Sequence, residues 1–162
     1  AEELRDTMLV LSGEINLAVG GLSIRPEMNL EVALSPRMIQ FSLAPGYQPD
    51  STPSQRNRRS VYIQRIRGLS DPLMEVFDKP NSSESCEMRD SASVTPQVFT
   101  LLNSDVVTKR SIAMALRLQG EDKSVERQIE RGYLRSLGRV PSAAMVQKLA
   151  AHYKKMVDFK VD

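Results

Sequence analysis

Four segments with helical patterns follow one another in the last third of the sequence, and three of them begin at a residue that caps helices. Thr95 stands before Pro96, Ser124 stands before apolar residues spaced by four, and Ser142 follows Pro141. Such side chains accept hydrogen bonds from the free amides of a first turn, where proline also fits. The connections between the segments are short, which favours antiparallel neighbours. The predicted helices run over residues 95–103, 105–118, 124–137 and 142–157.

The apolar residues of these segments indicate which positions can pack. In the second segment, Val106, Ile112, Ala113 and Leu116 are available for burial. The last segment carries two apolar residues per turn, the stripe of a helix that packs on a neighbour. That stripe consists of Met145, Val146, Leu149, Ala150, Tyr153, Met156 and Val157, with His152 at its edge. We therefore expect a mainly α, helical bundle-like domain.

The start of the sequence predicts another helix. Leu4, Met8, Leu11 and Ile15 repeat at intervals of four, three and four residues, which places them on one helix face. We expect this helix to end at Gly20-Gly21, because the left-handed turn that closes a helix favours glycine.

Between these helical parts the sequence predicts shorter elements. Residues 60–66 are rich in β-branched side chains and predict a short strand, which could pair with a second strand at 30–34. A short helix is predicted from Pro72 to about Phe77, with Ser70 or Asp71 as its cap.

Two long loops are also predicted. Prolines and small polar residues mark residues 44–57, and serines mark residues 78–94. We expect residues 44–57 to be the most exposed segment of the chain.

Several classes of protein are excluded by single residues. The 162-residue chain has one cysteine, Cys86, and one histidine, His152. An intrachain disulfide, a cysteine-based zinc site, covalent haem attachment and a multi-histidine metal site all need more. The net charge of +2 is too balanced to imply nucleic acid. The longest apolar run, near residues 15–24, is too short for a membrane span. We expect no metal and no cofactor.

A cluster of five arginines without an acid is the strongest charge feature. It consists of Arg56, Arg58, Arg59, Arg65 and Arg67. Guanidinium groups suit sulfate, phosphate and carboxylate, so one interpretation is an anion site. Six acids follow between Asp71 and Asp90, and pairing within the fold is the simpler interpretation. Tyr62 is the only aromatic residue in the basic stretch, which makes a poor platform for stacked bases.

Cys86 and a set of carboxylates are weaker candidates for chemistry. Cys86 stands near Arg89, and a thiolate there could be a nucleophile, but His152, the only histidine, is far along the chain. Asp71, Glu75 and Asp78 would share a helix face, where they could act as general acid and base or bind calcium. Packing, capping and ion pairing explain these residues more simply.

The residues of two loops and one strand are expected to converge. The candidate set is Arg58, Arg59, Arg65, Asp78, Cys86 and Arg89, either as an anion-binding site or as a structural clasp. We expect at least one partly buried Arg–Asp pair, formed by Arg59 or Arg89 with Asp78, because the arginine fork satisfies both carboxylate oxygens.

An ordered set of short motifs resembles one family. The motifs are Asn57-Arg58-Arg59-Ser60-Val61-Tyr62, Phe77-Asp78-Lys79-Pro80, Ser85-Cys86 with Arg89, Val94 to Ser104, and Gly138-Arg139-Val140-Pro141. Together with the opening Ala1 to Asp6, they resemble the planctomycete-specific C-terminal domain of unknown function. The resemblance covers essentially the whole chain.

The resemblance implies a context rather than a reaction. That family occurs in large secreted proteins, many of which also carry a planctomycete cytochrome c domain, and it brings no established catalytic residues. We therefore expect residues 1–162 to be a single domain, the C-terminal segment of an exported multidomain protein, at the cell surface or in the periplasm. The expected function is a non-catalytic structural or interaction module that packs on neighbouring domains or a partner protein. The alternative is a part of a carbohydrate-processing or redox enzyme system that binds an anionic, sulfated polysaccharide through the arginines.

Overall fold

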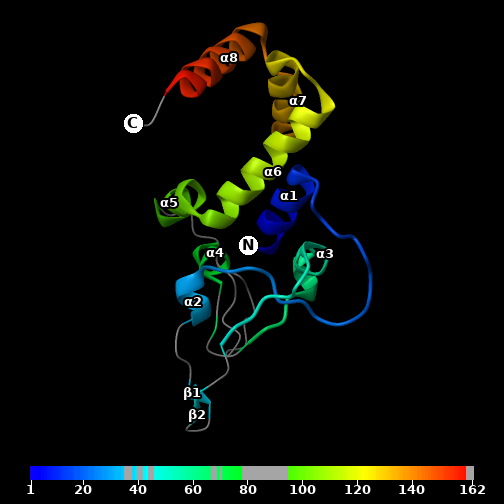
Figure 1. The fold of residues 1–162 in the computed structure, drawn as a ribbon, viewed down its shortest axis with the longest axis vertical. Coiled ribbons are helices and arrows are strands. Elements are labelled where there is room, and N and C mark those ends of the chain that lie inside the picture. The colour runs from blue at the N-terminus through cyan, green and yellow to red at the C-terminus, as the bar shows by residue number, and fades with distance from the viewer. Residues whose placement is uncertain are drawn as a thin grey trace. The chain divides into compact units, whose positions relative to one another are not determined.

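The computed structural model describes residues 1–34, 38–39, 42–43, 46–66, 69, 71–77 and 95–159. Over these residues the chain is mainly helical, as predicted (Figure 1). The chain divides into two compact units, Ala1–Ser111 and Ile112–Asp162, which we call the N-terminal and the C-terminal unit. Whether they belong to a single domain stays a prediction, so each unit is described by itself.

The first helix, α1 (Glu2–Ser12), is shorter than predicted. It ends at Gly13, which takes the left-handed conformation with φ 78°, and the Gly13 amide donates to the Val10 carbonyl at 3.1 Å. Gly20 and Gly21 also have positive φ, but they lie in the loop that follows. The expected end of the helix was therefore wrong, because an earlier glycine already closes it.

The buried face of α1 also differs from the predicted one. The buried residues are Arg5, Leu9 and Ser12, whereas the face expected from Leu4, Met8, Leu11 and Ile15 is half-buried. The spacing of four and three is the one predicted, but it starts one residue later. The buried face of α1 therefore includes polar side chains, which a search for apolar spacing cannot detect.

The predicted strand over residues 60–66 is wrong in its main part. Ser60–Tyr62 forms a 3₁₀ turn, η1, and the rest of the stretch makes isolated bridges to described residues, from Ile63 to Ile24 and from Ile66 to Leu69. The chain turns here because the amide and the hydroxyl of Ser60 both donate to the Asp6 carboxylate, each at 2.7 Å. Residues 30–34, the other expected strand, form the short helix α2 (Leu30–Leu34).

The described strands lie elsewhere and are short. β1 (Met38–Ile39) pairs antiparallel with β2 (Ser42–Leu43), with Met38 opposite Leu43. The mainly α prediction holds because this two-residue ladder is the only sheet among the described residues.

The segment predicted as the exposed loop 44–57 is anchored in its described part. It contains α3 (Pro53–Arg56), which begins with a capping box in which Thr52 and Gln55 bond each other. Most of its described residues are exposed, as expected, but Tyr47 and Asn57 are only 8% and 5% exposed and anchor the segment near both ends of its described part. Whether it is the most exposed segment of the chain stays a prediction. The predicted short helix is confirmed as α4 (Pro72–Val76), with the Asp71 carboxylate accepting from the Leu73 amide at 3.0 Å.

The C-terminal helices agree closely with the sequence pattern. They are α5 (Thr95–Asn103), α6 (Asp105–Glu121), α7 (Val125–Leu137) and α8 (Ala143–Asp158) (Figure 1). Ser124 and Ser142 accept from the third amide of α7 and α8, as expected of caps. Gly138 ends α7 with φ 66°.

The predicted burial of these helices is only partly correct. Val146 and Ala150 are buried, and α7 is the helix that α8 contacts. Ile112 and Leu116, which were expected to be available for burial, are 56% and 63% exposed. Periodicity identified an apolar face on α6 but not whether another element covers it.

Candidate functional site

Among the described arginines of the predicted cluster, Arg58 is the most deeply buried, at 9% exposure. One guanidinium nitrogen donates to the Leu22 carbonyl at 2.9 Å, and the other donates to the carbonyls of Ala18, at 3.0 Å, and Gly20. Its guanidinium carbon lies 3.9 Å from the centre of the Tyr62 ring, a cation–π contact. Both terminal nitrogens of Arg58 thus donate to carbonyls of the chain's own backbone.

The loop that surrounds Arg58 is held by further bonds. The Gly20 amide donates to the Tyr62 hydroxyl at 2.9 Å, and the Asn16 amide donates to the Asn57 carbonyl at the same distance. Gly20 has φ 80°, a conformation that turns its backbone without steric cost. Residues 16–22 therefore wrap around one side chain rather than around an apolar core.

Arg5 on α1 holds the other side of the cluster and was not predicted. It is 8% exposed, and it donates to the carbonyls of Arg58 at 2.9 Å and Arg56 at 2.8 Å, and to the Ser60 hydroxyl at 3.1 Å. Burial lowers the pKa of Arg5, while the neighbouring Asp6 opposes that shift. The sequence offers one signal for it: Arg5, Leu9 and Ser12 share a helix face.

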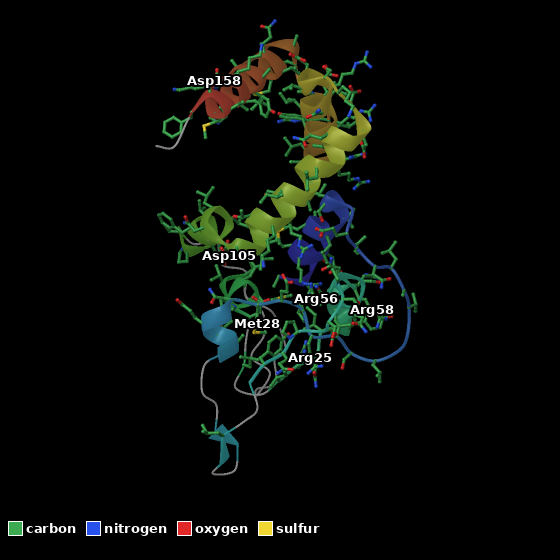
Figure 2. The ribbon with its side chains drawn as sticks, viewed as in Figure 1. Arg25, Met28, Arg56, Arg58, Asp105 and Asp158 are labelled. Atoms are coloured by element: carbon green, nitrogen blue, oxygen red, sulfur yellow. The ribbon has the colours of Figure 1, made fainter. Side chains whose placement is uncertain are left out.

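Arg56, the last residue of α3, binds the residues that directly precede this helix (Figure 2). Its guanidinium donates to the carbonyls of Asp50 and Ser51 at 2.8 and 2.9 Å and lies 2.9 Å from a Glu27 carboxylate oxygen. The Asp50 carboxylate in turn accepts from the Arg25 amide at 2.8 Å. Arg5, Arg56 and Arg58 together bind seven backbone carbonyls.

Arg59 and Arg65 are the two described arginines of the candidate set that are open to solvent. The Arg59 side chain is 59% exposed, and its Nε lies 3.7 Å from Asp6 Oδ2. Both arginines line a cavity of about 500 Å³ whose lining also includes Glu2, Glu3 and Asp6. A bound anion would therefore meet carboxylates as well as guanidinium groups.

The other half of the predicted site lies outside the described residues. This applies to Asp78, Cys86 and Arg89, and with them to the expected Arg–Asp pair with Asp78. Convergence of the candidate set stays a prediction. Among the described residues, Arg56 and Arg59 lie near Glu27 and Asp6, which precede the arginine cluster in the chain.

A larger cavity of about 840 Å³ lies in the N-terminal unit. Its lining includes Met28, Tyr47, Leu73, Phe99, Asp105 and Lys109, of which Figure 2 labels Met28 and Asp105. Lys109 lies 3.3 Å from Glu27, and the Tyr47 hydroxyl donates to the Pro26 carbonyl at 2.6 Å. Burial, aided by Asp71 and Asp50, raises the pKa of Tyr47 to about 12. Lys109 and the Tyr47 hydroxyl are thus already paired within the unit.

A second kind of surface lies on α8 in the C-terminal unit. Met145 and Met156 are 36% and 57% exposed, and Tyr153 is 44% exposed. His152, expected at the edge of the apolar stripe, is exposed beside them. Sequence analysis identified this stripe but expected it to be a packing face.

The described residues contain neither a long apolar helix nor a metal cluster. In them, no helix has the length and apolar character to cross a bilayer. Nor do they bring together three or more His, Cys, Asp or Glu side chains in a group that could hold a metal ion.

Comparison with known proteins gives one result. A family model described as PSD1, protein of unknown function (DUF1553), matches residues 1–153. No curated protein and no solved structure matches the chain.

Proposed function

Because this chain belongs to the PSD1 family of proteins of unknown function (DUF1553), we propose that it is a non-catalytic module that binds a neighbouring domain or a partner protein. The observation that carries this proposal is the apolar row of α8 that includes Met145 and Met156, which the described residues leave exposed. Large apolar side chains that stand together on a surface mark interaction sites more often than single ones do. A row on one ordered helix is a surface of this kind.

The arrangement of the arginines supports a structural rather than a catalytic role for the cluster. Arg5, Arg56 and Arg58 donate to backbone carbonyls of their own unit. Guanidinium groups occupied in this way are poorly placed to bind a substrate, although they can hold a loop rigidly. The N-terminal unit would then present a fixed surface without carrying out chemistry.

The setting of the module is also proposed. The motif resemblance supports an exported planctomycete protein with further domains, one of which could carry haem. In such a protein the apolar row of α8 would be covered by a neighbouring domain, which explains why a soluble module retains it.

The proposal is tested by comparing this chain with the longer protein encoded by its full reading frame. Met145→Gln combined with Met156→Gln changes two exposed side chains, so the melting temperature of the isolated chain should stay within about 1–2 °C of the parent. In the longer protein the same pair should lower the melting temperature by several degrees, because a buried contact is lost. Arg127→Gln, at a side chain that is 71% exposed, is the control. Equal melting of parent and double variant in both proteins would contradict a docking role.

The alternative function, binding of a sulfated polysaccharide, rests on Arg59 and Arg65 in the 500 Å³ cavity. Titration calorimetry with heparin tests it. If the arginines bind sulfate, affinity should fall at high salt and in the double variant Arg59→Ala/Arg65→Ala. Absence of heat at low salt would remove this alternative.

A further inference from the structure

The exposed row on α8 has the spacing of a helix–helix seam. Met145, Leu149, His152 and Met156 follow one another at intervals of four, three and four residues, which is the spacing of the a and d positions of a heptad. Met145, His152 and Met156 are exposed, and Leu149 is half-buried. A second helix could therefore lie along this row.

Part of the apolar arc of α8 is already buried, and the exposed remainder is the row itself with Tyr153 and Val157 beside it. Val146 and Ala150 are buried, and α8 contacts α7. A helix that lies on a lipid surface needs a broad apolar face, whereas a seam between two helices needs only a strip. The remaining strip on α8 fits a helix better than a membrane.

The open flank of the row is basic. Lys148 and Lys155 are seven residues apart, each directly before an apolar residue of the row, and both are exposed. No carboxylate of the described residues lies within ion-pair distance of either lysine. Hydrogen bonds from its own backbone amide and from Ser124 lower the pKa of the Glu126 carboxyl, and Lys154, on another side of α8, adds to that shift.

We propose, on the basis of the proposed function, that α8 binds an amphipathic helix whose apolar row is bordered by Asp or Glu. In helix pairs, charges beside the seam select the partner and its orientation. Lysines at equivalent positions one heptad apart would attract carboxylates at matching intervals and repel a basic helix. The chain thus specifies the charge of its partner as well as its shape.

Two synthetic four-heptad peptides serve as probes. Both carry Leu at the seam positions; one has Glu and the other has Lys at the positions that flank it. Fluorescence anisotropy with the whole chain should give an affinity for the Glu peptide at least about tenfold higher than for the Lys peptide at low salt, and a smaller ratio at high salt.

Charge reversal on α8 provides the decisive comparison. Lys148→Glu with Lys155→Glu should reverse the preference, so that the Lys peptide binds more tightly. Lys154→Glu makes a similar change on the same helix outside the seam and should leave the preference as it is. Circular dichroism verifies that each variant remains helical.

The remaining outcomes overturn the inference in distinguishable ways. Equal binding of both peptides that is lost in Met156→Gln would refute the charge selection but agree with an interaction module. Absence of binding, preferential binding of phosphatidylglycerol vesicles, or self-association through α8 in sedimentation would each refute an acidic helix as the occupant. The melting comparison of the longer protein decides the proposed function independently.

Discussion

Arg58 holds a loop in place, a role that apolar side chains usually have in small proteins. Its guanidinium group binds the carbonyls of Ala18, Gly20 and Leu22 and stacks on Tyr62. Planar guanidinium groups can donate in several directions at once, and the flat face remains free for an aromatic ring. The loop is therefore fixed by direction-dependent bonds, which a residue of similar volume cannot replace.

Replacement of Arg58 should be costly. Arg58→Ala would remove three part-buried hydrogen bonds to carbonyls and the contact with Tyr62, and we expect a loss of about 1–3 kcal/mol in the free energy of unfolding. Arg58→Lys keeps the charge but not the fork, so it should recover only part of that loss. Urea denaturation gives both values. The matched control is Arg59→Ala, at an exposed side chain, with an expected change within about 0.5 kcal/mol. A similar cost for both alanine variants would contradict this account.

Tyr47 should make the stability of the N-terminal unit depend on alkaline pH. The pKa of this phenol is raised from 10.0 to about 12, so the protonated form is favoured in the folded state. The stabilisation is complete below pH 10 and is lost as the pH rises from there towards 12. Urea denaturation on both sides of pH 10 should show a decline that Tyr47→Phe lacks. An identical decline in both proteins would assign the effect to other groups.

At the scale of elements, capping residues were more informative than apolar spacing. Ser124, Ser142 and Asp71 begin helices as predicted, because a cap acts within its own turn. The end of α1 and the fate of residues 60–66 were predicted wrongly. The end of α1 is set locally by Gly13, an earlier glycine than the expected pair. The turn at Ser60 depends on a distant partner, Asp6, which no local pattern contains.

Two glycines should respond to alanine in opposite ways. Gly120 lies within α6, and an added Cβ would have open space around it, so Gly120→Ala should stabilise by about 0.5–1 kcal/mol. Gly138 also has open space, but its φ of 66° strains any L side chain, so Gly138→Ala should destabilise by about 1 kcal/mol. Thermal denaturation of the two variants measures the difference. A gain in stability for both variants would contradict the expectation that the left-handed conformation at the end of α7 requires glycine.

At the scale of the whole molecule, the two compact units are built differently. The described interior of the N-terminal unit includes Arg5, Ser12, Asn57, Arg58 and Ser60 as well as apolar residues. The C-terminal unit consists of capped helices joined by short connections. This difference explains why the sequence predicted the second unit well and the first one poorly. Apolar periodicity marks helices, but a polar interior has no comparable pattern.

The candidate site shows the same limit. The arginine cluster was recognised from its density of charge, whereas Arg5, 53 residues from Arg58 in sequence, was not. Which arginines turn inward depends on carbonyls supplied by the loop around Ala18 and Gly20. Composition identifies such a cluster, but only the fold separates its buried members from its exposed ones.

The two units should lose protection independently. Arg58→Ala removes bonds that lie within the N-terminal unit, so amide hydrogen exchange should accelerate around α1 and α3. Exchange in α7 and α8 should remain as in the parent, because their contacts lie within the C-terminal unit. Mass spectrometry of exchanged peptides measures both. Acceleration of α8 to the same extent would mean that the units unfold together.

The bonds of Arg5 also impose an order on folding during synthesis. α1 is synthesised before its partners, because the carbonyls to which Arg5 donates belong to Arg56 and Arg58, more than fifty positions later. At about 5–20 residues per second, the guanidinium group waits roughly 3–10 s for its acceptors. During that interval the guanidinium group stays hydrated, and this face of α1 has no partner against which it can be buried. α7 and α8, by contrast, can meet as soon as both are synthesised, because their contacts join neighbouring segments of the chain.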